Sequence, residues 1–387
     1  MKEEHEYLLP APLKNFVCKM GACRHACCEG WPITFSVDDY FRLMGSEHSA
    51  ELGERLDRGI KLNLSPTPDR YAIIYPKYDG NCPMRLPDGR CSIQAELGEG
   101  VLAAVCRLYP RGLHFDPVYE CSFSNSCEGV LEVLFESDAP ISFVKKPMAF
   151  DINARRKRSY VFDTMGREED IRLWLISLVQ ERAYPLTVRI LRLGKALLAL
   201  DDIMERKDKA ALDTLLDGGF ITDVPDICVD KEHLADGLHI MERLLAILDG
   251  RSNSVCDYGE EALKYFTSDN SFDAYLNARQ SFETTFPRWE IWFEHMLVNH
   301  MFFEQFPFQD RPEKPWDEFV SVCAVYSLLR FLSLGCFSAR ESYGAYVDMC
   351  AALFRLVGHT AFSAYAGRML ASVGCHMPDK VFELISL

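Results

Sequence analysis

The sequence lacks any hydrophobic run that is both long and free of charge. Its longest apolar stretches lie around Val322–Leu334 and Ile190–Leu200, and arginine or lysine interrupts each of them. A membrane-spanning helix needs about 20 consecutive apolar residues, so these stretches predict buried helices instead. The N-terminal segment MKEEHEYLLPAPLKNF also lacks the apolar core of a secretory signal. We therefore expect a cytoplasmic protein with no membrane span.

Positive charge is scarce as well. The chain has 42 Lys and Arg against 57 Asp and Glu, and its formal net charge is −15. A surface that binds nucleic acid needs clustered Lys and Arg. The one basic run, Arg155–Arg158, is typical of a solvated surface. We expect no nucleic-acid partner.

Three familiar signatures are missing. No two cysteines are separated by two residues, as they are in zinc knuckles, and the regular cysteine run of ferredoxins is also missing. There is no glycine-rich strand–loop–helix with its acidic partner. The sequence therefore does not support a Rossmann-like domain.

Cysteine itself is abundant. The chain has 15 cysteines, and nine of them lie between Cys18 and Cys127. A disulfide framework is typical of small secreted domains, whereas this chain has 387 residues, no secretory signal and an odd number of cysteines. The other six occur singly in apolar helical patterns, where cysteine is usually a small buried apolar residue. They are Cys228, Cys256, Cys323, Cys336, Cys350 and Cys375.

The clustered cysteines predict a metal or iron–sulfur site, because thiolates are soft ligands that select zinc, copper(I) or iron. The adjacent side chains of Cys27 and Cys28 diverge, so they seldom bind one small metal ion and could serve different centres. A four-iron cluster takes four thiolates, which leaves the others to bind a second metal, pack the site or act as redox partners. An iron–sulfur cluster is the first interpretation, a zinc site the second and metal-free burial the third. The candidate ligands are Cys18, Cys23, Cys27, Cys28, Cys82, Cys91, Cys106 and Cys127.

Composition changes near residue 140. From Cys18 to Cys127 the chain is rich in Gly, Pro and Asp, which predicts that residues 1–140 form a loop-rich, cysteine-organised metal domain with a little β-structure. Over residues 141–387, long patterns with 3.6-residue spacing predict an all-helical domain, so the expected fold class is mainly α. The predicted helices cover 170–183, 186–216, 231–248, 288–306, 316–334 and 339–362.

A strand pair and a helix are predicted in the middle of the first domain. Alternating side chains favour strands near Arg70–Pro76, before a turn at Asp79-Gly80. A helix is expected over Ile93–Leu108, ended by Pro110, with Cys106 on its last turn.

A further helix is expected to begin at Asn125. Glu128 follows three residues later, which is the spacing of a capping box. Cys127 would then lie in the first turn, where the helix dipole favours a thiolate.

Four ordered motifs occur in the first domain, and two related segments occur in the second. The motifs are CxxxxCxxxCCxGW (Cys18–Trp31), CP…GxCxxQxELGE (Cys82–Glu99), CRxYPR (Cys106–Arg111) and SxSC (Ser124–Cys127), and the segments are Val298–Phe308 and Leu328–Gly335. Together they resemble the flagellin lysine-N-methylase, or FliB, family, which overlaps a wider group of cysteine-rich zinc- or iron-chelating proteins. One position departs from the family pattern, because Gly358-His359 stands where a Glu-His pair is expected.

The resemblance implies a protein lysine N-methyltransferase. Members of the family move methyl groups from S-adenosylmethionine to lysine ε-amines of flagellin, with a [4Fe–4S] cluster implicated. The implied cofactors are therefore S-adenosylmethionine and the cluster, with zinc as the alternative metal, and the implied partner is flagellin or another lysine-bearing protein. The alternative function is a non-enzymatic zinc- or cluster-binding structural or interaction protein.

Methylation requires a neutral lysine amine, whereas the ammonium group has an ordinary pKa of about 10.4. An aromatic channel can lower that pKa by desolvation, and a carboxylate or histidine can take the proton. The aromatic candidates are Trp31, Tyr109 and Tyr119, and the candidate bases are Glu29, Glu96, His300 and His359. No particular catalytic residue is predicted.

Arg107 and Arg111 flank a Leu-Tyr-Pro segment and are the candidate cofactor-binding residues. Two guanidinium groups can clamp a carboxylate, such as that of the cofactor, through bidentate hydrogen bonds. The alternative is that they form ion pairs with Glu96 or Glu99.

Overall fold

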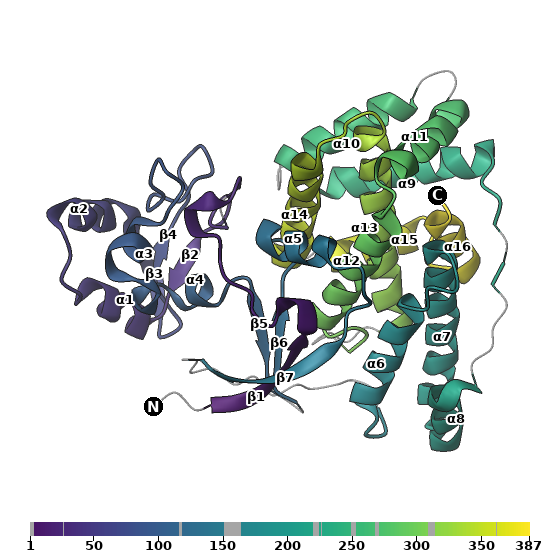
Figure 1. The fold of residues 1–387 in the computed structure, drawn as a ribbon, viewed down its shortest axis with the longest axis horizontal. Coiled ribbons are helices and arrows are strands. Elements are labelled where there is room, and N and C mark those ends of the chain that lie inside the picture. The colour runs from purple at the N-terminus through teal and green to yellow at the C-terminus, as the bar shows by residue number, and fades with distance from the viewer. Residues whose placement is uncertain are drawn as a thin grey trace.

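The computed structural model describes residues 4–25, 27–115, 118–150, 164–219, 224–225, 227–248, 253–267, 271–308, 314–360 and 362–387. Arg155–Arg158 lie outside these ranges. The described chain forms a small domain, a four-stranded sheet and a large helical bundle, arranged in that order across the molecule (Figure 1). The prediction of a mainly α fold is confirmed.

The bundle is built around one central helix. Helix α13 has buried side chains on every face, and α7, α10, α11, α15 and α16 pack around it. The bundle consists of α6 (Glu168–Val179), α7 (Leu186–Arg206), α8 (Lys209–Thr214), a π-helical turn (Leu215–Gly219), α9 (Lys231–Leu248), α10 (Asn253–Phe266), α11 (Ser271–Thr285), α12 (Trp289–Phe303), α13 (Pro315–Phe337), α14 (Tyr343–His359), α15 (Phe362–Ser372) and α16 (Pro378–Ile385).

Helix α13 is longer than the predicted 316–334. Among the described residues it is the one helix whose length and composition would allow it to cross a membrane, yet its most apolar 18-residue window is completely buried. Its neighbours in the bundle cover it, as they would the core helix of a soluble protein.

Two of the long helices predicted from the sequence are wrong, because each is interrupted in the structure. The predicted 186–216 helix breaks at Lys207, which is left-handed with φ 53°, and Asp208 then caps α8 by accepting a hydrogen bond from the Ala211 amide. The predicted Ile93–Leu108 helix is instead α3 (Ser92–Leu97), a 3₁₀ turn (Glu99–Val101) and α4 (Ala104–Leu108). Gly98 separates them, because its φ of 81° cannot continue a helix.

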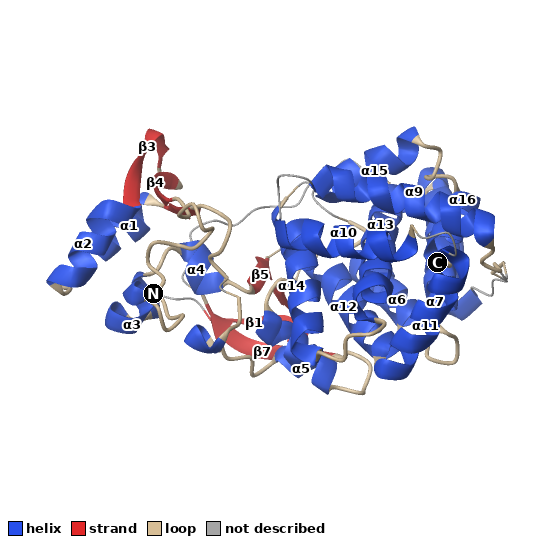
Figure 2. Cartoon of the chain, turned by 90° about the horizontal axis from the view of Figure 1, so that it is seen from above, coloured by secondary structure: helices blue, strands red, loops and turns tan. Residues whose placement is uncertain are grey.

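The four-stranded sheet joins the small domain to the bundle (Figure 2). Its strand order is β5 (Arg111–His114), β6 (Glu120–Phe123), β1 (Glu4–Pro10) and β7 (Phe143–Ala149). Strand β1 pairs with β6 in parallel and with β7 in antiparallel fashion. Strand β7 lies in the segment predicted to be all-helical, because its pairing with β1 along seven registered positions overrides the pattern.

The small domain has a core of its own. It contains β2 (Ile33–Phe35), α1 (Val37–Met44), α2 (Ala50–Gly59), β3 (Ile60–Thr67) and β4 (Arg70–Ile74), followed by α3 and α4. Its sheet has the order β2-β4-β3. Strand β4 lies in the segment predicted to form strands, and the predicted turn at Asp79-Gly80 follows it, where the Gly80 amide donates to the Lys77 carbonyl at 2.9 Å. The strand that pairs with β4 is β3, which precedes it and is joined to it at Pro68-Asp69.

The buried side chains form two cores, and the boundary between these cores does not lie at residue 140. One core is made by residues between Ile33 and Ala103. The other joins β1, β6 and α5 (Glu128–Glu136) to the bundle. Most of the singly occurring cysteines are buried as expected, but Cys228 is exposed in the loop before α9 and Cys256 is half-buried.

Two buried polar contacts fasten the sheet and α5 to the bundle. The guanidinium of Arg172 on α6 donates to both carboxylate oxygens of Glu120 on β6, at 2.7 and 3.2 Å. The amide of Asn299 on α12 donates to the Phe123 carbonyl and to the Asn125 side chain, both at 2.7 Å, and Asn125 donates to the Met296 carbonyl. These pairs satisfy polar groups that burial would otherwise leave without partners.

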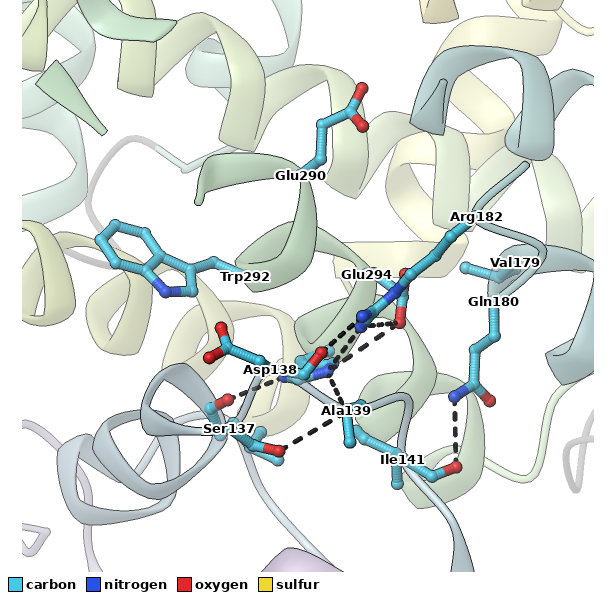
Figure 3. Close-up of polar contacts among 12 residues, drawn as sticks. Ser137, Asp138, Ala139, Ile141, Val179, Gln180, Arg182, Glu290, Trp292 and Glu294 are labelled. Atoms are coloured by element: carbon cyan, nitrogen blue, oxygen red, sulfur yellow. Dashed lines mark hydrogen bonds and ion pairs between the residues drawn. The ribbon is translucent and has the colours of Figure 1, made fainter. Parts of the chain in front are cut away.

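A third contact surrounds Glu294 of α12, which is completely buried (Figure 3). Arg182 donates two hydrogen bonds of 2.8 Å to its carboxylate, and Arg189 donates one of 2.5 Å. Arg182 also donates to the Asp138 carbonyl, and Gln180 donates to the Ile141 carbonyl. The network joins α6, α7 and α12 to the segment between α5 and β7.

We predict that Glu294→Gln lowers the free energy of unfolding by about 3–5 kcal/mol, because Arg182 and Arg189 then lose the buried carboxylate that they share and Arg189 keeps only the partly exposed Glu290, at 3.6 Å. Urea denaturation followed by circular dichroism measures this change. The control is Glu205→Gln, an exposed residue paired with Lys314, for which a loss below about 1 kcal/mol is expected. Equal losses in the two variants would contradict the prediction.

Candidate thiol-lined metal site

All eight predicted ligand cysteines line one cavity of about 150 Å³. The cavity lies between the small domain and the bundle, and it could hold several water molecules or a polynuclear metal centre. Cys121, the ninth clustered cysteine, is buried in β6 and does not line it. The sequence therefore identified the residues that come together, and their binding of metal stays a prediction.

A hairpin-like loop brings Cys82 and Cys91 to the same side of the cavity. The Arg85 amide donates to the Cys82 carbonyl at 3.0 Å, and Arg85 pairs with Cys91 in an isolated bridge. The loop turns at Gly89, whose φ is 86° and whose missing Cβ would lie 2.7 Å from the Gly21 carbonyl oxygen. Glycine is required there by both its conformation and this close contact.

Asp39 of α1 positions Cys106. Its buried carboxylate accepts hydrogen bonds from the Ala104 amide at 3.0 Å and the Arg42 guanidinium at 3.1 Å, and it lies 3.0 Å from Arg107. These contacts hold α4 against α1, so that Cys106 faces the cavity. The ion pair expected between Arg107 and Glu96 or Glu99 is instead made with Asp39.

Glu128 fixes the loop that carries Cys18 and Cys23. Its carboxylate accepts hydrogen bonds from the backbone amides of Arg24 and His25, at 3.0 and 3.3 Å, and from Lys19 Nζ at 2.8 Å. The predicted capping box is thus wrong, because Glu128 binds a distant loop. Helix α5 begins at Glu128 with Cys127 as its N-cap, so the cap lies two residues later than the expected Asn125.

The thiols interact with one another. Burial, followed by the charges of Glu128 and Cys127, raises the pKa of Cys23 to about 12. Burial, followed by the charges of Cys91 and Cys28, raises the pKa of Cys106 to about 12. Hydrogen bonds from Cys27 and Cys82 lower the pKa of Cys28, which makes it the preferred thiolate of that trio. A bound metal cation would replace the protons and compensate the buried negative charge.

The donors surround the cavity instead of meeting at one point. Within the described ranges, no three His, Cys, Asp or Glu side chains are placed to hold a metal ion directly. Zinc binds each thiolate at about 2.3 Å, so its ligands must converge. In a four-iron cluster each thiolate binds a different iron, so the sulfurs lie farther apart. Eight thiols around a roomy cavity therefore fit a cluster better than a single zinc ion.

Three arginines at the cavity, Arg85, Arg111 and Arg355, have no carboxylate partner among the described residues. The Arg111 guanidinium lies 5.8 and 5.7 Å from the ring centres of Phe16 and Phe123, and its buried Nε has no hydrogen-bond partner. Arg355 of α14 also lines the cavity. Arg355 could not be recognised from the sequence, because a single arginine in an amphipathic helix is usually a surface residue.

Only one of the aromatic candidates lines the cavity. Tyr109 does, and its hydroxyl lies 3.0 Å from Ser126 Oγ. Trp31 donates from its indole to the Cys27 carbonyl, and Tyr119 stacks on His5 beside the four-stranded sheet. These two rings belong to loop and sheet packing.

The candidate bases lie elsewhere or are not described. Glu29 and Glu96 are not part of the described lining, and His300 packs against Phe354 in the bundle. The side chain of His359 is outside the described set. His25, which no sequence motif singled out, lines the cavity with its Nε2 3.7 Å from Asp348 Oδ2 of α14.

We predict that Glu128→Gln speeds hydrogen exchange at the Arg24 and His25 amides by about tenfold or more. Hydrogen bonds to a charged group are worth about 1.5–3 kcal/mol, and the neutral amide weakens them. Exchange measured by mass spectrometry or NMR tests this. Glu132→Gln is the matched control, because Glu132 contacts only the Lys19 and Arg24 side chains of this loop. Equal protection in both variants would be the contrary result.

The fold and the cavity define a mainly α protein whose thiol-lined site is shared between a cysteine-rich domain and a helical bundle. Residues 172–372 match the model of the FliB lysine N-methylase C-terminal domain. Because that match covers more than half of the chain, the protein belongs to the FliB lysine N-methylase family, as the cysteine motifs predicted.

The chain is also similar to two curated proteins. It is 32% identical to the lysine-N-methylase of Salmonella choleraesuis (strain SC-B67) over 105 residues, which are 27% of this chain and 26% of that protein. It is 31% identical over the same length to the lysine-N-methylase of Salmonella typhimurium (strain LT2). The aligned part thus spans about a quarter of each relative. No solved structure matches.

Proposed function

We propose that this chain is a protein lysine N-methyltransferase that moves a methyl group from S-adenosylmethionine to lysine ε-amines of flagellin or a similar protein. The observation that carries the proposal is the family match over 172–372, in which α14 supplies part of the wall of the thiol-lined cavity. The names of the two relatives support the same activity.

The cavity residues suit the binding of a lysine side chain. Phe16 and Tyr109 give it an apolar wall, which favours the neutral amine by desolvation. His25 and its neighbour Asp348 lie where the proton leaving the amine could be accepted. Arg111 and Arg355 provide positive charge for a carboxylate, such as that of the cofactor.

The implied groups fit the donors that are present. Bound S-adenosylmethionine supplies a methyl group on an electrophilic sulfonium, which a well-positioned amine can accept in a water-free site. An iron–sulfur cluster held by the cavity cysteines would supply rigidity to a region of the chain that is rich in loops. The cysteines on both sides of the cavity are the residues that would hold it.

The activity is tested with anaerobically purified protein, reductant, methyl-labelled S-adenosylmethionine and flagellin, followed by mass spectrometry of the lysines. We expect label on lysine with the wild type, and at least a tenfold loss of iron and of product with Cys23→Ser. Cys350→Ser should retain both, because Cys350 is buried in α14 away from the cavity. Bound metal without any methylated peptide would leave the non-enzymatic binding protein as the function.

Arg111→Gln is expected to raise the KM for S-adenosylmethionine by about tenfold or more with a smaller change in kcat. A charged hydrogen bond to a carboxylate is worth about 1.5–3 kcal/mol. Arg58→Gln, on the exposed surface of α2, serves as the control. An unchanged KM together with a lower melting temperature would show that Arg111 only packs against Phe16 and Phe123.

A further inference from the structure

We propose that the phenol oxygen of Tyr109 accepts a hydrogen bond from the ε-amine of the substrate lysine, and that Ser126 positions this oxygen. The inference rests on the proposed function and deepens it, because it names the group that orients the lysine. Tyr109 belongs to the CRxYPR motif and Ser126 to the SxSC motif, so the contact joins two of the four motifs of the sequence.

Both hydroxyl groups lie at the cavity. Tyr109 and Ser126 line it, and the Tyr109 hydroxyl lies 3.0 Å from Ser126 Oγ. Because the hydroxyl contacts a residue that itself lines the cavity, the polar end of the tyrosine lies in the cavity wall and not in one of the packed cores.

The backbone holds the two residues together. Tyr109 is the C-cap of α4, and Ser126 directly precedes Cys127, the N-cap of α5. The Ser124 amide donates to the Pro110 carbonyl at 2.8 Å. The segment after α4 and the segment before α5 therefore lie side by side, and this pairing does not depend on the contact between the two hydroxyls.

A third hydroxyl extends the pair into a chain. Ser124 Oγ lies 2.7 Å from Ser126 Oγ and accepts a hydrogen bond from the Ser126 amide at 3.2 Å. Ser124 and Ser126 are 5% and 1% exposed, so bulk water does not compete for these contacts. Hydroxyl protons rotate to suit their partners. Tyr109 can therefore donate to Ser126 while Ser126 donates to Ser124, and the phenol oxygen then acts as an acceptor.

Methyl transfer requires an acceptor at the lysine nitrogen. The lone pair of the neutral amine forms the new N–C bond, while the C–S bond of the sulfonium breaks and its electron pair stays on sulfur. A group that donated to this lone pair would block the transfer. An acceptor that binds an N–H leaves the lone pair available and fixes its direction. The product is a methylammonium group, which then releases a proton to water.

The charges near Tyr109 favour a neutral amine. Burial raises the pKa of Tyr109, whereas the guanidinium of Arg355 acts in the opposite direction. The phenol therefore stays uncharged at neutral pH, and Arg355 lies close enough to influence it. A neighbouring cation disfavours a lysine ammonium, so the reactive neutral form of the amine is favoured beside Arg355.

The test uses the anaerobically purified full-length protein and two fluorescein-labelled flagellin peptides. The peptides are identical except that the lysine of one is norleucine in the other, which has no amine. Fluorescence anisotropy gives the ratio of the two affinities. Tyr109→Phe should lower the preference for the lysine peptide by about 2- to 12-fold, as expected for one neutral hydrogen bond, and leave the affinity for the norleucine peptide unchanged. The kcat of methylation should fall by about tenfold or more.

The matched control is Tyr346→Phe. Tyr346 is a buried tyrosine of α14 whose hydroxyl lies 3.2 Å from Ser333 Oγ, and it does not line the cavity. Both variants remove one oxygen from a tyrosine–serine pair, so a general effect of lost packing would appear in both. Tyr346→Phe should keep the affinity ratio and the kcat of the wild type.

Ser126→Ala tests the positioning role. It should lower the preference for the lysine peptide in the wild-type background and have no further effect in Tyr109→Phe, because Ser126 acts through the phenol. Additive effects of the two substitutions would contradict this role of Ser126. The iron content of each variant, measured alongside, should equal that of the wild type.

An unchanged affinity ratio in Tyr109→Phe would overturn the inference, because the hydroxyl would then only join the two walls of the cavity. If the wild type still methylates flagellin in that case, the proposed function stands. If the ratio falls as expected but the wild type methylates no peptide, the lysine site stands and the proposed function alone is overturned.

Discussion

The carboxylate of Glu128 is the contact on which the cavity most depends. It belongs to α5, which is part of the bundle core, and it binds the backbone of a loop more than a hundred residues earlier in the chain. The segment that carries Cys18 and Cys23 contains only a short 3₁₀ turn and no buried side chains, so it depends on polar contacts such as this one and the ion pairs of Lys19 and Arg24. One buried acid therefore connects the packing of the bundle to the geometry of the thiols.

Periodicity was a good guide to the bundle. It located α9 to the residue, and it located α6, α12, α13 and α14 within a few residues. It missed α10, α11, α15 and α16, and it missed the break at Lys207, because a left-handed residue in a continuous apolar pattern leaves no trace in hydrophobicity. Periodicity also missed strand β7, because its pairing partner β1 is far away in sequence and a local pattern cannot reveal the pair.

The sequence predicts which cysteines make up the site, but not which other residues contact them. Spacing and residue type selected the eight thiols, since thiolates that bind metal must be numerous and close in sequence or in space. The partners of Arg107 and Glu128 could not be found in this way, because Asp39 and the Arg24 amide are brought to them only by tertiary folding. Arg355 and Asp348 lie still farther away in sequence, on α14, and the residue pattern of this helix does not indicate that it packs near the cysteines.

The two walls of the cavity come from parts of the chain that are far apart in sequence, and this has a consequence for folding during synthesis. Arg24 pairs with Asp348, 324 residues later in the chain. At translation rates of about 5–20 residues per second, Cys23 and its neighbours leave the ribosome roughly 15–65 seconds before that wall exists. During this interval the cysteines face solvent, so their thiols are then most accessible to metal ions and to oxygen.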